Sequence, residues 1–181
     1  MVADINVTLG SGCPEEVRVR DALDRIRLRY DLTAFERTRD VRIERGVIPH
    51  SHPVLTLSDR YGDEDDRLLA TYLHEQLHWW SMDCPGARDG RDEAVFAALD
   101  RDFPLPLAPP EGCGSRISNL IHLHVCWLEL EAVSGLLGNA RARSILGALP
   151  YYTAVYETVL RQRAELATRF NAAGMGLPRT A

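Results

Sequence analysis

The chain has 181 residues, of which 45% are hydrophobic and 26% are charged, and its net charge is −5. This length and composition predict one globular domain over residues 1–181, and the acidic balance with scattered basic residues argues against nucleic acid as a partner. The N-terminal stretch MVADINVTLGSGCPEE lacks the basic start and apolar core of a signal peptide, and no run of 18 apolar residues is present, so we expect a cytoplasmic protein with no membrane partner.

The first expected elements are a helix, a strand and an edge strand. A helix is expected over residues 14–32, where a proline suits the first turn and apolar residues recur at helical spacing. The segment 35–46 alternates in places and ends at a glycine, which predicts a strand and a turn. In the segment 47–59, Pro49 and Pro53 exclude a central ladder position, so an edge strand is expected there.

Helices dominate the rest of the chain. They are expected at about 65–82, 91–103, 116–139, 140–149 and, as one long element, 150–170. The segment 104–115, PLPLAPPEGCGS, is a loop rich in proline and glycine that is long enough to cover a cleft. This order predicts an α+β domain that is mostly helical, with a small N-terminal sheet and a metal site between two helices.

The stretch HEQLH, residues 74–78, is the strongest functional signal in the sequence. On a helix, His74 and His78 lie on one face, where two imidazoles can bind one metal ion at about 2.0–2.1 Å each. Glu75 is rotated by about 100° from His74, so it lies beside such an ion and can take a proton from water there. The alternative is an amphipathic helix with two incidental histidines, but the apolar neighbours and the preceding edge strand favour metal binding.

The motif and its place in the chain resemble those of the zincin metallopeptidases. In zincins an edge strand precedes the motif helix and holds an extended substrate, and a second buried helix follows; the resemblance covers about the middle half of this chain. It implies one Zn²⁺ ion bound by His74 and His78, with Glu75 as the general base and PVLTL as the edge strand.

The third ligand is not given by the motif. The metzincin pattern requires glycine and histidine three and six residues after the second motif histidine, where this chain has Ser81 and Cys84. Cys84 could still bind zinc by its chemistry, although Pro85 beside it suggests a helix end. Gluzincins take a glutamate from a later helix, which directs attention to the segment IHLHVCWLELEAV.

That segment carries ionisable residues on two opposite helix faces. His122, Cys126 and Glu129 share one face, whereas His124 and Glu131 share the other. Because a buried charge is costly unless it is paired or metal-bound, we expect one face at the metal and the other at solvent or a partner arginine. Glu129 is the favoured third ligand, His122 comes next and Glu131 competes, while His124 is expected to be a satisfied core residue.

Other polar residues could support the site. If Glu129 binds the metal, His122 could contact the substrate or a transition-state oxyanion; if His122 binds it, Glu129 would support the ligands. Tyr156 could stabilise an oxyanion with its hydroxyl. A core tyrosine whose ring is buried and whose hydroxyl reaches water is, however, the more common case. His50 and His52 are expected in a turn or along a substrate rather than as metal ligands.

The sequence therefore predicts a zinc-dependent hydrolase, most simply a peptidase of narrow specificity in which Glu75 and metal-bound water act on an amide bond. Two alternatives stay open: a metal-dependent tailoring enzyme acting on a small molecule or modified peptide, and a non-catalytic zincin relic that acts by binding. Two imidazoles and a carboxylate also accept iron or another divalent metal. A short peptide or peptide-like small molecule is the expected substrate, because a loop could cover the cleft of so small a domain.

Overall fold

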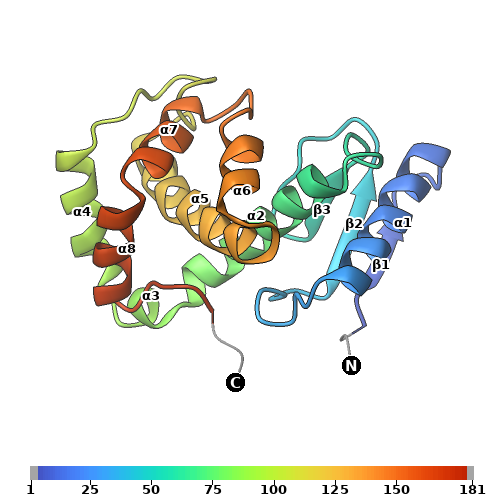
Figure 1. Ribbon diagram of the computed structural model, residues 1–181, viewed down its shortest axis with the longest axis horizontal. Coiled ribbons are helices and arrows are strands. Elements are labelled where there is room, and N and C mark those ends of the chain that lie inside the picture. The colour runs from blue at the N-terminus through green and yellow to red at the C-terminus, as the bar shows by residue number, and fades with distance from the viewer. Residues whose placement is uncertain (1–3, 179–181) are drawn as a thin grey trace. The chain divides into compact units, whose positions relative to one another are not determined.

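The computed structural model describes residues 4–178 and has the α+β, mostly helical architecture that the sequence predicts (Figure 1). The strands are β1 (Asn6–Leu9), β2 (Asp40–Glu44) and β3 (Leu55–Ser58). The helices are α1 (Pro14–Arg29), α2 (Asp65–Asp83), α3 (Pro85–Arg88), α4 (Asp92–Asp102), α5 (Arg116–Leu137), α6 (Asn139–Leu146), α7 (Thr153–Arg161) and α8 (Arg163–Ala172).

The described chain forms two compact units. The first runs to Trp80 and takes in Pro178, and the second is Ser81–Leu177. The boundary falls inside α2, so the last turn of this helix belongs to the second unit. The expectation that residues 1–181 act as a single domain stays a prediction.

The first unit is built on a parallel sheet with the strand order β1-β2-β3. Val7 pairs with Val41, and Val41 pairs with Leu55 on the other side. Helix α1 connects β1 to β2 and contacts both strands, as a crossover between parallel strands requires. β3 lies at an edge of this sheet, as predicted, whereas β1 is not among the predicted elements.

A buried polar network joins α1 to α2 within the first unit. Arg27 of α1 pairs with Glu36 (Nε–Oε1 2.6 Å), and the Tyr72 hydroxyl of α2 donates to the same carboxylate oxygen at 2.9 Å. Gln76, also on α2, donates to the Tyr72 hydroxyl at 3.1 Å and to the Thr38 carbonyl at 3.0 Å. These bonds fix α2 relative to α1 and to the segment that leads into β2.

Helix α5 is the central element of the second unit, where α4, α6, α7 and α8 contact it (Figure 1). Trp127 of α5 packs against Phe170 of α8 with the ring centroids 5.1 Å apart. α5 is long and apolar enough to cross a membrane, with a mean hydropathy of 1.4, but 61% of that stretch is buried inside the protein. Such burial is usual for the core helix of a globular fold.

The expectation of one long helix over 150–170 was wrong, because α7 and α8 are separate helices that meet at Gln162. The Arg143 side chain of α6 donates to the carbonyl oxygen of Leu160 at 2.9 Å. On the other side of the break, Arg163 pairs with Glu131 of α5 (Nε–Oε1 2.6 Å). Contacts from distant helices thus hold the two segments, and neither proline nor glycine marks the break in the sequence.

Candidate metal centre

The motif lies in the second half of α2, and its middle residue anchors the helix. Gln76 is fully buried, and its amide oxygen accepts the main-chain N–H groups of Arg37 (2.7 Å) and Thr38 (3.0 Å). On a helix Gln76 is rotated by about 200° from both His74 and His78. The anchor and the two histidines therefore face opposite sides of α2.

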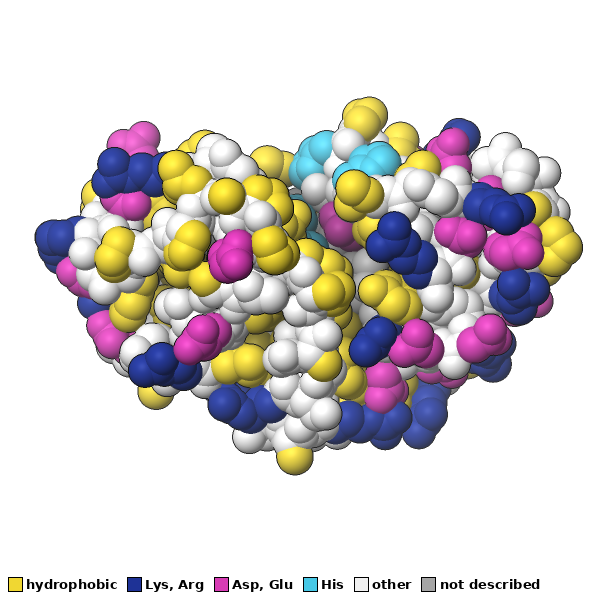
Figure 2. Space-filling model, turned by 90° about the horizontal axis from the view of Figure 1, so that it is seen from above, with side chains coloured by type: hydrophobic (Ala, Val, Ile, Leu, Met, Phe, Trp, Pro, Cys, Tyr) yellow, Lys and Arg dark blue, Asp and Glu magenta, His cyan; other side chains and the backbone are white. Residues whose placement is uncertain are grey.

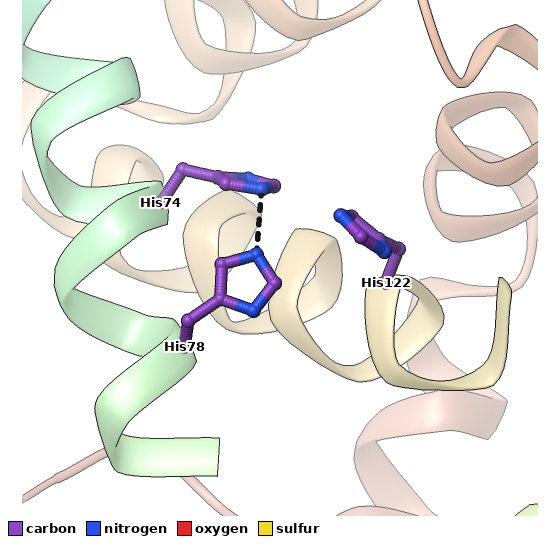
Figure 3. Close-up of side chains that lie close together, drawn as sticks. All are labelled: His74, His78 and His122. Carbon is purple, nitrogen blue, oxygen red and sulfur yellow. Dashed lines mark hydrogen bonds between the residues drawn. The ribbon is translucent and has the colours of Figure 1, made fainter. Parts of the chain in front are cut away.

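The imidazoles of His74 and His78 converge on one point, as the spacing predicts. Their Nε2 atoms lie 3.2 Å apart, and the ring planes meet at 72° with the centroids separated by 4.9 Å (Figure 3). Two nitrogen ligands of one tetrahedral zinc ion, each at about 2.0–2.1 Å, would be about 3.4 Å apart. The pair therefore has the separation that a shared ion requires, and metal binding itself stays a prediction.

Glu75 directly follows His74 on α2 and is buried. Its side chain is only 6% exposed. Helical geometry places it about 100° around the axis from His74 and about 60° from His78. A carboxylate in this position flanks a metal ion instead of facing it, which is the arrangement expected of a base.

The residue after the motif binds the segment that precedes β3. The indole N–H of Trp79 donates to the carbonyl oxygen of Ser51 at 3.1 Å. The ring of His52 stacks on the Trp79 ring with the centroids 4.0 Å apart and the planes 24° apart. Ser51 and His52 are also joined, with 2.8 Å between Oγ and Nδ1. This segment is thus held against α2 beside His78.

The same segment occupies part of the β3 edge. His50 and Thr56 exchange two main-chain hydrogen bonds, from His50 N–H to Thr56 O (3.0 Å) and from Thr56 N–H to His50 O (2.8 Å). Both main-chain groups of Thr56 are therefore occupied by His50 instead of being open to an extended substrate. Histidine side chains reach the surface beside hydrophobic ones in Figure 2, and this segment contributes exposed His50, His52 and Ile48.

On α5, His122 is held in one tautomer. Its Nδ1 atom lies 2.7 Å from the main-chain carbonyl oxygen of Ser118. A carbonyl oxygen can only accept, so Nδ1 carries the proton and the lone pair of the neutral ring is on Nε2. Metal-binding histidines commonly donate their second ring N–H to such a carbonyl. In its neutral form, His122, which projects from α5 in Figure 3, thus has the tautomer of a metal ligand.

The other two residues of the predicted face form a buried cluster with Tyr156. The Tyr156 hydroxyl donates to Glu129 Oε2 at 2.8 Å, and these side chains are 3% and 1% exposed. The Cys126 sulfur lies within 4.8 Å of a Glu129 carboxylate oxygen. Burial above all, and then the nearby Cys126 and Glu129, hold the pKa of Tyr156 well above its usual range, so the hydroxyl remains a donor. Tyr156 is therefore bound to Glu129, the third ligand that the sequence favours.

The opposite face of α5 has structural partners. Glu131 pairs with Arg163, so this face meets a partner arginine, which is one of the two outcomes expected for it. His124 is fully buried; its Nε2 donates to the Met175 carbonyl and its Nδ1 lies 2.8 Å from Ser81 Oγ, which confirms it as a satisfied core residue. Burial lowers the pKa of His124 to about 4, so this ring is neutral. Ser81 lies three residues after His78, so this bond attaches the last turn of α2 to α5.

Cys84 is the weakest of the predicted ligand candidates. Its thiol is fully buried and lies 3.5 Å from the carbonyl oxygen of Ser81. Burial raises the pKa of this thiol, which opposes the thiolate form that binds zinc. The residue instead precedes the short helix α3.

Sequence reasoning did not identify the surroundings of His122. The ring of Tyr152 lies against that of His122, with the centroids 4.5 Å apart. The loop expected over 104–115 is bonded to the beginning of α7, because Pro110 O accepts from Thr153 N–H (3.1 Å). Asn119 of α5 holds the same loop by accepting from Cys113 N–H at 2.7 Å. The adjacent aromatic residues Tyr151 and Tyr152 were the available signal, but the sequence does not specify where their rings point.

Comparison with protein families, with curated proteins and with solved structures found no match for this chain. The resemblance to the zincins therefore rests on the HEQLH motif and on the order of the elements around it.

Proposed function

We propose that the protein is a zinc-dependent hydrolase acting on an amide bond of a short peptide or peptide-like molecule. The observation that carries this proposal is the convergence of the His74 and His78 Nε2 atoms, 3.2 Å apart, beside the buried Glu75. A site that only stabilises a fold needs ligands but no carboxylate base beside them. The combination favours catalysis over a non-catalytic relic.

The ligand set that we propose is His74, His78 and His122. Neutral imidazoles suit zinc, and the Ser118 carbonyl fixes the Nδ1–H tautomer of His122, which leaves Nε2 as its ligand atom. Glu129 is the alternative third ligand, because a carboxylate that binds metal through one oxygen can accept the Tyr156 hydroxyl through the other. Three imidazoles or two with a carboxylate also accept iron or another divalent metal.

In this proposal the metal ion and the protein side chains supply different parts of the reaction. When bound, the ion supplies Lewis acidity, which lowers the pKa of a water molecule and polarises a substrate carbonyl. Glu75 takes the proton from the attacking water and delivers it to the leaving amine. Tyr156 keeps its proton because its pKa is raised, and it can stabilise negative charge on the substrate only by leaving its bond to Glu129.

The substrate that we propose is short. The His50–Thr56 bridge occupies main-chain groups at the outer side of β3, which an extended protein substrate would need for pairing. The same observation favours a second candidate function, a metal-dependent tailoring enzyme acting on a small molecule or modified peptide. Rapid digestion of denatured casein by the zinc-loaded protein would contradict both.

Metal content tests the proposal directly. We expect the wild-type protein purified without added metal to contain about one equivalent of a divalent ion, and His74→Ala and His78→Ala to lose it. His50→Ala is the matched control, because His50 is exposed and lies outside the motif. Elemental analysis with zinc titration gives the readout, and full occupancy in both motif variants would show that α2 does not hold the ion.

A further inference from the structure

Tyr152 has a backbone conformation that is unfavourable for its side chain. Its φ and ψ are 53° and 35°, and among residues 4–178 it alone has a positive φ without being glycine. The left-handed region brings Cβ close to the main chain, so it is uncommon for any residue except glycine and asparagine and an outlier for a bulky one. A strained residue persists only where its surroundings determine it, and such residues gather at functional sites.

Helix capping does not account for this conformation. Tyr152 immediately precedes α7, but its side chain makes no capping hydrogen bond, and serine, aspartate or asparagine would be the usual residues there. The first turn of α7 is satisfied instead by the loop before α5: Thr153 N–H donates to Pro110 O (3.1 Å) and Ala154 N–H to Glu111 O (3.2 Å). These bonds fix the chain directly after Tyr152.

The conformation places the aromatic ring of Tyr152 on His122. The ring centroids are 4.5 Å apart and the planes meet at 56°. Tyr151 contacts Tyr152 edge-on, with a centroid separation of 5.3 Å. His122 is thus held twice, by the Ser118 carbonyl at Nδ1 and by the Tyr152 ring. The carbonyl sets the tautomer, and the ring contact restricts rotation of the imidazole.

We propose that Tyr152 is a positioning residue that orients the His122 imidazole for metal binding. This inference rests on the proposed function and on His122 as the third ligand. Partners that fix the orientation of a metal-binding histidine typically contribute about 10–100-fold to metal affinity. A tyrosine that only packs against its neighbours would instead change stability without a separate effect on the metal.

Two substitutions at one position separate these roles. Tyr152→Phe keeps the ring and should bind Zn²⁺ as the wild type does. Tyr152→Asn tolerates the left-handed conformation but removes the ring, so zinc affinity should fall by about 10–100-fold while the melting temperature of the metal-free protein stays the same or rises. Tyr151→Asn is the matched control, because it removes the neighbouring aromatic ring at a residue whose backbone is not in the left-handed conformation. Competition with a chromophoric chelator measures affinity, and the visible spectrum of the Co²⁺-loaded protein reports ligand geometry.

A double-mutant cycle provides the decisive comparison. In a His122→Ala background, Tyr152→Asn should cause no further loss of zinc affinity. Equal affinity of Tyr152→Asn and wild type, or a loss shared by Tyr151→Asn, would overturn the inference. If Tyr152→Asn does not fold, Tyr152→Leu keeps a hydrophobic side chain without an aromatic face and is subject to the same criteria. Absence of zinc binding by the wild type would refute the proposed function, whereas wild-type affinity in His122→Ala would refute this inference and His122 as third ligand but leave the hydrolase proposal standing.

Discussion

At the scale of single residues, main-chain carbonyls select the tautomers of the histidines on α5. Ser118 O fixes a proton on Nδ1 of His122, and Met175 O fixes one on Nε2 of His124. The two rings are therefore opposite tautomers, although they lie two positions apart. The sequence predicts their opposite faces from the helical period, but it does not reveal which carbonyl each ring meets. That part of the site follows only from tertiary structure.

Glu75 provides the sharpest test at this scale. Glu75→Gln should keep the fold and the bound metal, because the side chain has the same size and is not a ligand. Loss of the base should lower the hydrolysis rate by about 10²–10⁴-fold. Mass-spectrometric detection of products from a library of short peptides, with zinc-loaded protein, measures the change. Glu64→Gln, at an exposed residue before α2, is the control, and undiminished turnover of Glu75→Gln would place the base elsewhere.

At the scale of elements, strongly periodic helices could be predicted from the sequence. The bounds of α2 and the two faces of α5 follow from apolar spacing, and the pairing of Glu131 with Arg163 matches the expected partner arginine. The strand β1 could not be predicted in the same way, because it has only four residues; NVTL alternates polar and apolar side chains, but so short a run is a weak signal. The break at Gln162 and the conformation of Tyr152 depend on contacts with distant segments.

The anchor of α2 gives a prediction for this helix. Gln76→Ala would leave the part-buried N–H groups of Arg37 and Thr38 without their acceptor, which should cost about 2–4 kcal/mol of unfolding free energy. Urea unfolding of the metal-free protein measures this cost. The chain's other glutamine supplies the control, since Gln162→Ala should change stability by less than about 0.5 kcal/mol. Equal stability of the two variants would mean that Gln76 does not hold α2 in place.

At the scale of the whole molecule, the described chain divides into two compact units, and candidate ligands lie in each of them. His74 and His78 belong to the first unit, and His122 belongs to the second. Helix α2 continues across the boundary, and within the second unit its last turn is bonded to α5 through Ser81 and His124. Each unit has its own buried core.

One buried carboxylate ties together the beginning of the chain in the first unit. Glu16 of α1 is 1% exposed and accepts the main-chain N–H groups of Ser11 (2.9 Å), Gly12 (2.7 Å) and Arg45 (3.0 Å). It therefore connects the loop after β1 with the turn after β2. Burial by itself raises the pKa of Glu16, but the N–H donors more than offset this and lower the pKa from 4.5 to about 2.

This depressed pKa predicts how the stability of the protein depends on pH. Between about pH 4.5 and pH 2 the unfolded chain binds more protons at Glu16 than the folded chain does, so stability rises with pH across this window. The contribution of Glu16 is complete above about pH 4.5 and is lost as the pH falls toward 2. We expect Glu16→Gln to be less stable than the wild type at pH 6, and the difference to shrink steadily below about pH 4.5. Urea unfolding of both proteins at a series of pH values, with a chelator present to remove metal effects, measures this difference. A gap between the two proteins that stays constant from pH 6 to pH 2.5 would show that the Glu16 carboxylate is not held in its charged form by the N–H groups around it.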